Sequence, residues 1–188
     1  MQPGPYWIIK EKNDHFIGLC FSSKGLFACT IPYPSLEELK ESISRYNITD
    51  EIQEAGVAKD LEEVLNDLIW KIWIGKDPTI SNQIPIDFSG YSSKQIVVYN
   101  KCMGIPRGEV LSYGQLAEKS GFPNAARYVG TTMAQCRLPL IIPCHRVVRA
   151  NGRPGGSSDD ARIRMLLLER EGYSRPKKKK SKFSINIV

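Results

Sequence analysis

The sequence predicts an α+β fold in which a small β-meander precedes a mostly helical second half. Three short runs near the start, residues 6–10, 15–21 and 25–31, are rich in β-branched and aromatic side chains, and turn residues separate them. From residue 34 onward, apolar side chains recur mostly at helical spacing. Short strands joined by tight turns favour an antiparallel meander with helices packed against it.

The sequence also predicts where the chain divides. The break Gly75-Lys76-Asp77-Pro78 is followed by a loop-like stretch over residues 79–90, which is typical of a linker. A length of 188 residues accommodates one large domain or two small ones. We therefore expect an N-terminal α/β scaffold domain at 1–85, a C-terminal domain at 86–173 and a basic tail at 174–188.

Two cysteines lie in the predicted meander. Turns at Asn13-Asp14 and at residues 22–25 would place Cys20 and Cys29 on neighbouring strands, where they could face each other. Together with His15 they are also candidate metal ligands, although zinc sites usually show closer spacing. A disulfide, a metal site and plain packing all stay open, and packing is favoured because free cysteine is often buried.

Two helices are expected in the N-terminal part. Pro34-Ser35 opens the first, and Glu37 and Glu38 fall in its first turn, where negative charge suits the helix dipole. The second spans about residues 60–73 and carries an apolar stripe at helical spacing. That stripe consists of Leu61, Val64, Leu65, Leu68, Ile69 and Ile72.

The C-terminal part predicts two short helices joined by a tight turn. Ser112 followed by Gln115 has the spacing of a capping box at the start of one helix. Asn124 is expected to cap the next helix. The pattern resembles a helix-turn-helix, in which the small Ala126 allows close approach to a backbone and Arg127 projects from the first turn.

Charge and cysteine usage limit the class of protein. The formal net charge is +6, and the positive excess lies in the C-terminal half. Such a surface suits a polyanionic partner, although the lysine-rich tail could instead be a solvated end. The five cysteines show no CxxC spacing, and neither a signal peptide nor a run of membrane-spanning length is present. We expect a reduced cytoplasmic protein, or a nuclear one in a eukaryote, with no membrane partner.

Pro143-Cys144-His145-Arg146 is the stretch on which the predicted chemistry depends. The apolar run 138–142 leads into it, and the prolines around that run predict buried extended chain. The neighbouring histidine and arginines would stabilise a thiolate at Cys144, and thiolate is the reactive form of cysteine. The alternative is a small buried side chain beside a satisfied core histidine. A glycine-rich loop over 149–158 and a helix over 159–171 should follow.

Four strings of the C-terminal part occur in the order and spacing of one known family. They are Gly108-Glu-Val-Leu-Ser-Tyr-Gly-Gln-Leu-Ala117, Ala126-Arg-Tyr-Val-Gly130, Ile141-Ile-Pro-Cys-His-Arg-Val-Val148 and Leu167-Leu-Glu-Arg-Glu-Gly172. Through them the chain resembles the O6-alkylguanine-DNA alkyltransferases, also called methylated-DNA–protein-cysteine methyltransferases. The resemblance implies an RNase H-like N-terminal domain and a winged-helix-like C-terminal domain for DNA binding and alkyl transfer.

The resemblance also assigns catalytic roles by position. Cys144 would be the nucleophile that takes the alkyl group, His145 a water-mediated base, and Glu171 the acceptor that orients the histidine. Tyr113 would press on the target phosphate and donate a proton toward the departing guanine. These roles fit the residue types, because a thiol needs its proton removed and a base needs an orienting partner.

Positions for DNA and for the substrate follow from the same resemblance. Arg127 would enter the stack where the flipped nucleotide was. The further DNA-binding positions are Ala126, Tyr113, Gln115 and Asn124. The substrate pocket would be lined by Met133, Cys136, Val147, Ser157 and Ser158.

Three departures from the family pattern concern rate and substrate range. Cys136 stands where many members carry asparagine, and a thiol is a weaker hydrogen-bonding group than an amide. Ser157 stands where many carry tyrosine, and Asp159 and Asp160 follow where glycine is common.

The implied function is repair of DNA by irreversible transfer of the alkyl group from O6-alkylguanine, and from O4-alkylthymine, to Cys144 in a single turnover. The expected partner is double-stranded DNA that contains alkylated guanine, the expected state is a monomer, and the reaction needs neither a metal nor an organic cofactor. Three alternatives stay open: a non-catalytic lesion binder, a helix-turn-helix regulator and a Cys-His hydrolase.

Overall fold

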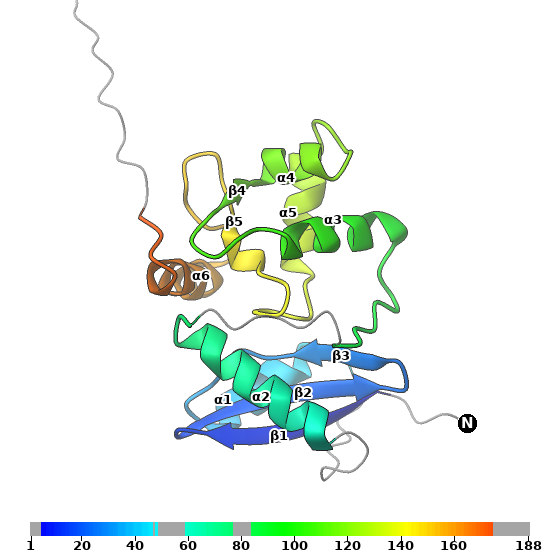
Figure 1. Cartoon of the computed structure of the whole chain (residues 1–188), viewed down its shortest axis with the longest axis vertical. Helices are drawn as coiled ribbons and strands as arrows, with labels where there is room; N and C mark the ends of the chain where they lie inside the picture. The colour runs from blue at the N-terminus through cyan, green and yellow to red at the C-terminus, as the bar shows by residue number, and fades with distance from the viewer. Residues whose placement is uncertain (1–4, 47, 49–58, 77–83, 175–188) are drawn as a thin grey trace, which may run out of the picture.

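The computed structural model describes residues 5–46, 48, 59–76 and 84–174. A unit built on a three-stranded sheet and a mostly helical unit lie one above the other (Figure 1). This mixed architecture confirms the predicted α+β class. Most of the expected basic tail, residues 175–188, lies outside the described residues.

The sheet is an antiparallel meander in the order β1-β2-β3. Its strands are β1 (Tyr6–Lys12), β2 (His15–Ser22) and β3 (Gly25–Cys29). Asn13 and Asp14 join the first two strands with φ angles of 50° and 57°, which is the left-handed turn that suits the twist of a hairpin. The predicted strands and turns are confirmed.

Cys20 and Cys29 lie on neighbouring strands as predicted, but their side chains do not face each other. Cys20 is aligned with Ala28, and Cys29 is aligned with Leu19. The side chains of adjacent positions point to opposite faces of a sheet, so the two thiols belong to separate hydrophobic clusters. Both cysteines are free and buried, which favours packing over a disulfide.

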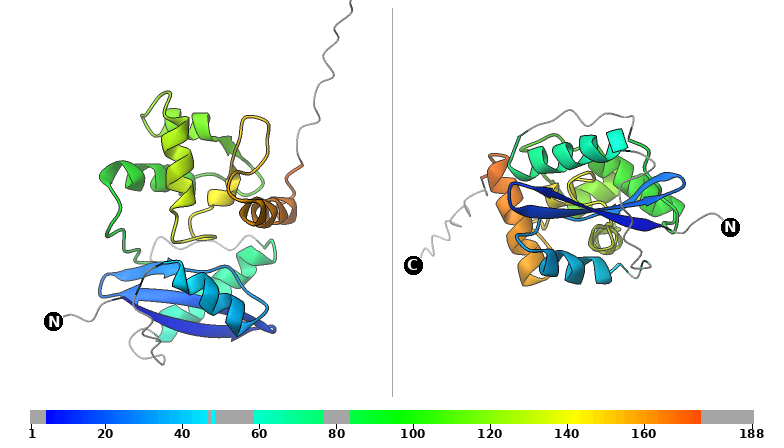
Figure 2. Two further views of the ribbon diagram at one scale, coloured as in Figure 1. Left: turned by 180° about the vertical axis from the view of Figure 1, so that it is seen from behind. Right: turned by 90° about the horizontal axis from the view of Figure 1, so that it is seen from below.

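Two helices cover the opposite faces of the sheet (Figure 2). Helix α1 (Leu36–Ser44) begins after Ser35, whose side chain accepts a hydrogen bond from the Glu38 backbone N–H, as predicted. Helix α2 (Lys59–Trp73) buries four of the six predicted stripe residues. Val64 is an exception, because its residue is 57% exposed on the outer side of the helix.

The second unit contains four helices among the described residues. They are α3 (Ser93–Met103), α4 (Tyr113–Lys119), α5 (Ala126–Ala134) and α6 (Ser158–Arg170). The strands β4 (Leu111–Ser112) and β5 (Val147–Val148) pair in parallel, and the 3₁₀ helix η1 (Cys144–Arg146) precedes β5.

The start of α4 agrees with its prediction, and the start of α5 does not. Ser112 and Gln115 form the expected capping box. The cap residue of α5 is Ala125, which has no side-chain capping bond. Asn124 instead takes a left-handed conformation with φ 66°, which asparagine tolerates, and this places it in the turn before the cap.

The apolar run 138–142 is buried as predicted, but it is not a strand. Leu140 has φ 72°, and the Ile142 N–H donates to the Leu138 carbonyl at 2.9 Å, so the run folds into a turn. The Cys144 N–H then donates to the Ile142 carbonyl at 2.6 Å, and η1 begins at the cysteine. Proline and a left-handed residue interrupt extended pairing here, which periodicity alone does not reveal.

The two units share one hydrophobic core that runs from the sheet to α5 and α6. Backbone bonds also join them: the Asp87 N–H donates to the Leu26 carbonyl at 2.9 Å, and the Cys29 N–H donates to the Arg137 carbonyl at 2.9 Å. Arg170 stacks on Trp73 at 4.6 Å and donates to its carbonyl at 2.6 Å. Within the described ranges, no helix is long and apolar enough to cross a membrane.

Candidate active site

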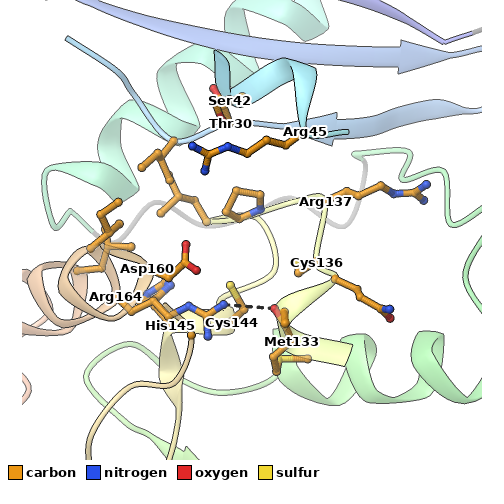
Figure 3. Close-up of a pocket in the computed structure, with 18 of the residues that line it drawn as sticks. Thr30, Ser42, Arg45, Met133, Cys136, Arg137, Cys144, His145, Asp160 and Arg164 are labelled. Atoms are coloured by element: carbon orange, nitrogen blue, oxygen red, sulfur yellow. Dashed lines mark hydrogen bonds between the residues drawn. The ribbon is translucent and has the colours of Figure 1, made fainter. Parts of the chain in front are cut away.

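A cavity of about 790 Å³ lies between the two units and reaches the cysteine of η1. The Cys144 sulfur points into this space, and Arg45 at the end of α1 reaches it from the opposite side (Figure 3). The sheet unit contributes mainly polar side chains: Thr30, Tyr33, Ser42, Arg45 and Tyr46. The helical unit contributes Met133, Cys136, Cys144, His145, Asp160 and Arg164, among others.

His145 and Glu171 form a buried pair directly beside the nucleophile candidate. The His145 Nε2 and Glu171 Oε1 atoms are 2.8 Å apart, and the two residues are 1% and 7% exposed. Arg146 binds the same carboxylate through Nε and Nη2, at 3.0 and 2.8 Å for the shortest contacts. Its Nη1 donates to the Ile105 carbonyl at 2.7 Å, which fixes the guanidinium in place.

Glu171 stays ionised in an unfavourable location. It is the residue that ends α6, where the negative end of the helix dipole opposes a carboxylate. Burial also opposes its charge, but hydrogen bonds from His145 and Arg146 outweigh burial and lower its pKa to about 2. The Gly108 N–H adds a weaker bond to Oε2 at 3.3 Å.

This pair determines which nitrogen of His145 is free. With an anionic Glu171 as acceptor, Nε2 carries the proton and donates it, and Nδ1 keeps its lone pair. Nδ1 is buried and makes no hydrogen bond to any residue that the structure describes. It is therefore available to take a proton, and the carboxylate would stabilise the imidazolium that forms.

Cys144 differs electrostatically from the other four cysteines. A hydrogen bond from the Cys136 thiol lowers the pKa of Cys144, and Arg164 and His145 add to this effect against burial. Burial raises the pKa of Cys20, of Cys29 and of Cys102, and the bond to Cys144 raises that of Cys136. Among the five thiols, the shift toward thiolate occurs at Cys144.

Arg164 connects the cysteine to the loop before α6. It donates to the Met133 carbonyl at 3.3 Å and to the Gly155 carbonyl at 3.5 Å. Tyr113, at the start of α4, lies against the same loop, because a Cβ at Gly155 would overlap its hydroxyl oxygen. Glycine at this position allows the tyrosine to approach the site.

The predicted DNA-binding positions lie at the start of α4 and α5. Arg127 is exposed in the first turn of α5, and Ala126 is its first residue. Asn124 is exposed in the preceding turn. Gln115 is exposed in α4, and its side-chain oxygen accepts from the Ser112 N–H at 2.8 Å, so the cap occupies that acceptor.

The five predicted pocket residues separate into two groups. Met133 and Cys136 line the cavity with Cys144. Val147 is fully buried in β5, and Ser158 is an exposed residue at the start of α6. Ser157 caps α6, and its hydroxyl donates to the Asp160 carboxylate at 2.7 Å. These last three residues do not border the cavity.

Sequence reasoning missed two arginines of the site. Arg146 was expected only to favour a thiolate, whereas it clamps Glu171 from 25 positions earlier in the chain. Arg164 was not singled out, although it lies one helical turn after Asp160 on the predicted final helix. That spacing is the signal that could have found it.

The fold and the site define a class of protein. A helical unit with two short helices joined by a turn carries a cysteine that favours its thiolate, next to a buried histidine–glutamate pair. This is the arrangement of a protein that uses a cysteine as nucleophile, with a base and an orienting acceptor beside it.

Comparisons with known proteins specify the class further. Residues 93–173 match the family described as 6-O-methylguanine DNA methyltransferase, DNA binding domain. The methylated-DNA–protein-cysteine methyltransferase of Saccharomyces cerevisiae is 27% identical over 168 residues, which cover 89% of this chain and 87% of that protein.

Two solved structures show the same fold. The O6-methylguanine methyltransferase of Mycobacterium tuberculosis superposes with a TM-score of 0.68 at 22% identity, covering 93% of this chain and 96% of that chain. The O6-methylguanine DNA methyltransferase of Methanococcus jannaschii gives 0.60 at 26% identity, with coverages of 96% and 99%. Residues 93–173 thus match the DNA-binding domain of the 6-O-methylguanine DNA methyltransferases, and the chain as a whole is similar to proteins of that kind.

Proposed function

We propose that this protein repairs DNA by transferring the alkyl group of O6-alkylguanine to its own Cys144. One observation carries the proposal: the sequence that matches the DNA-binding domain of 6-O-methylguanine DNA methyltransferases contains a cysteine whose pKa is lowered beside a His145–Glu171 pair. A thiolate can attack the alkyl carbon, whereas a neutral thiol is a poor nucleophile.

Each residue of the site would carry out a different step of this reaction. His145 takes the thiol proton through a water molecule at Nδ1, and Glu171 holds the histidine in the required tautomer. The sulfur of Cys144 forms a bond to the alkyl carbon as the bond from that carbon to O6 breaks. The departing guanine needs a proton, and Tyr113, next to Gly155, donates it.

The alkyl carbon must leave the duplex before the thiol can reach it. We propose that α5 presents Arg127 to the DNA and that this side chain fills the stack as the target nucleotide flips out. Filling the stack offsets part of an unstacking cost of roughly a few kcal/mol. Ala126, Gln115 and Asn124 would contact the backbone nearby. O4-alkylthymine is the second expected substrate, because it presents the same O-alkyl group.

The product limits the protein to one turnover. Alkyl transfer leaves a thioether on Cys144, and a thiolate is a poor leaving group for attack by water. Each molecule therefore removes one alkyl group.

A titration of damaged duplex tests this function. Duplex DNA with a single O6-methylguanine is incubated with increasing amounts of protein, and the methylguanine that remains is measured after hydrolysis of the DNA. We expect removal to reach a plateau at one lesion for each protein molecule. A lesion binder would retard the duplex and leave the methyl group in place, and a hydrolase would exceed the plateau.

We also propose the finer organisation that the resemblance implies. The N-terminal unit, 1–85, would be an RNase H-like scaffold, which the meander flanked by α1 and α2 supports. The C-terminal unit, 86–173, would be winged-helix-like, which the short β4–β5 pair beside α4 supports. The protein would act as a monomer in the compartment that holds its DNA, the cytoplasm or a nucleus.

A further inference from the structure

Cys136 is in contact with the candidate nucleophile. It lies two residues after α5, and it lines the same cavity as Cys144 (Figure 3). The two thiols also interact, which lowers the pKa of Cys144 and raises that of Cys136. Cys136 is half-buried and Cys144 is 7% exposed, so both sulfurs border a space that a small oxidant can enter.

The other three cysteines lack this arrangement. Cys20, Cys29 and Cys102 are fully buried, and the Cys29 thiol donates to the Pro139 carbonyl at 3.3 Å. Burial raises the pKa of each of them, which suppresses the reactive thiolate. Cys136 and Cys144 are therefore the pair suited to redox chemistry.

We propose that Cys136 and Cys144 form a reversible disulfide when the protein meets a peroxide. This would be a second reaction of the Cys144 sulfur, separate from alkyl transfer. It rests on the proposed function in one respect: oxidation would stop Cys144 from accepting an alkyl group, and reduction would restore that ability. A reactive thiolate beside a second thiol is the arrangement typical of redox-sensing cysteines.

The reaction proceeds in two balanced steps. The Cys144 thiolate attacks one oxygen of hydrogen peroxide, the O–O bond breaks, and sulfenic acid forms while hydroxide leaves and is protonated to water. The sulfur of Cys136 then attacks the sulfenic sulfur, and an S–S bond forms as the S–O bond breaks. The released hydroxide takes the Cys136 proton and leaves as water. The two sulfurs lose two electrons, and the peroxide gains them.

The thiol contact determines whether the oxidation can be reversed. A sulfenic acid with a thiol neighbour condenses to a disulfide, which dithiothreitol reduces. A sulfenic acid without such a neighbour is open to a second peroxide, and the resulting sulfinic acid is not restored by thiols. Cys136 would thus protect the Cys144 sulfur from irreversible oxidation before that sulfur has taken up an alkyl group.

Peptide mapping of peroxide-treated protein tests the proposal. Trypsin cleaves after Arg127, Arg137 and Arg146, so the disulfide joins peptide 128–137 to peptide 138–146. We expect this joined pair, lighter by two hydrogens than the two free peptides together, and we expect dithiothreitol to separate it. Joined peptides that contain Cys29 or Cys102 instead, or oxygen adducts on Cys144 without a joined pair, would overturn the proposal.

Variants at Cys136 provide the second measurement. Free Cys144 is quantified by iodoacetamide labelling of peptide 138–146 before peroxide, after peroxide and after dithiothreitol. Wild type and the matched control Cys102→Ala should recover most of their labelling. Cys136→Ser and Cys136→Ala should lose that recovery and accumulate sulfinic acid. Equal recovery in wild type and both Cys136 variants would contradict the proposal.

Neither readout depends on DNA repair. If reduced protein fails to take a methyl group from O6-methylguanine while the joined peptides still form, the proposed function fails and the disulfide stands. If repair proceeds and the joined peptides never form, the disulfide fails alone.

Discussion

Several groups lower the pKa of Cys144, and the Cys136 thiol has the largest effect among them. It donates a hydrogen bond to the thiolate, the Arg164 guanidinium adds positive charge, the His145 ring acts in the same direction, and together these outweigh burial. The resemblance implies asparagine at this position in many members of the family, and this chain supplies a thiol donor instead. At the scale of single residues, the nucleophile and its immediate donors form one unit.

Replacing Cys136 should change the pH at which Cys144 reacts. A hydrogen bond to a charged group contributes about 1.5–3 kcal/mol, so Cys136→Ala should raise the pH midpoint of Cys144 alkylation by about one unit or more. The measurement is the rate of iodoacetamide labelling at Cys144 across pH. Cys136→Ser keeps an O–H donor and should restore most of the shift. An unchanged midpoint in the alanine variant would show that Cys136 does not stabilise the thiolate.

Glu171 should make stability depend on pH in the acid range. Its folded-state pKa of about 2 lies below the ordinary value near 4.5, so its contribution is present above that ordinary value and is lost as pH falls toward 2. The difference corresponds to about 3 kcal/mol. Urea unfolding at pH 7 and pH 3 should show a large loss in wild type and a smaller one in Glu171→Gln. The exposed neighbour variant Glu169→Gln should behave like wild type. Parallel losses in all three proteins would exclude Glu171 as the source.

Four elements of the helical unit each carry one of the side chains to which we assign a role in the proposed function. Helix α4 begins with Tyr113, α5 carries Arg127 in its first turn, η1 begins with Cys144, and α6 ends at Glu171. Each position lies at or near an element terminus, where the backbone direction changes and a side chain can project. The turns and caps between these elements therefore determine the geometry of the site.

Arg127 at the start of α5 should matter for duplex DNA and not for a free base. Arg127→Ala should leave the reaction with free O6-benzylguanine nearly intact, because that substrate needs no flipping, and should slow transfer from duplex DNA strongly. Single-turnover rates on both substrates make the comparison. Arg162→Ala removes the same charge from an exposed site on α6 and is the matched control. Equal losses on both substrates would indicate a structural role for Arg127.

Ser157 should contribute to the stability of α6 through its cap. Its hydroxyl accepts from the Asp160 N–H at 3.3 Å and donates to the Asp160 carboxylate at 2.7 Å. Ser157→Ala should lower the free energy of unfolding by about 1 kcal/mol, and Ser158→Ala, one residue later, should change it much less. Chemical denaturation at pH 7 measures both. Equal effects of the two substitutions would contradict the capping role.

At the scale of the whole molecule, one core and several polar contacts hold the two units around the cavity. Arg107 donates to the Arg170 carbonyl at 3.0 Å and to the Gly75 carbonyl, and Arg170 stacks on Trp73. The end of α2 is thus joined to the end of α6, next to Glu171. The sheet unit thereby supports the element that presents the carboxylate, in addition to forming one wall of the cavity.

Local signals account for the parts of the fold that the sequence predicted. Asn13-Asp14 defines its hairpin, and Ser35 defines the start of α1, because turn and cap chemistry depends on adjacent residues. The run 138–142 was wrongly predicted as extended, since its turn depends on the left-handed Leu140. At the site, the motifs predicted the pairing of His145 with Glu171, which the structure shows, but the proximity of Cys136 to Cys144 and the Arg146–Glu171 clamp depend on tertiary packing.

The location of the transferred methyl group tests the central claim most directly. Wild type and Cys144→Ser are each incubated with duplex DNA that contains O6-methylguanine, and their tryptic peptides are weighed. We predict one methyl group on peptide 138–146 of wild type, at Cys144, and none anywhere in the variant, because a hydroxyl is far less acidic than a thiol. A methyl group on another residue of wild type, or removal of the lesion by Cys144→Ser, would contradict the account.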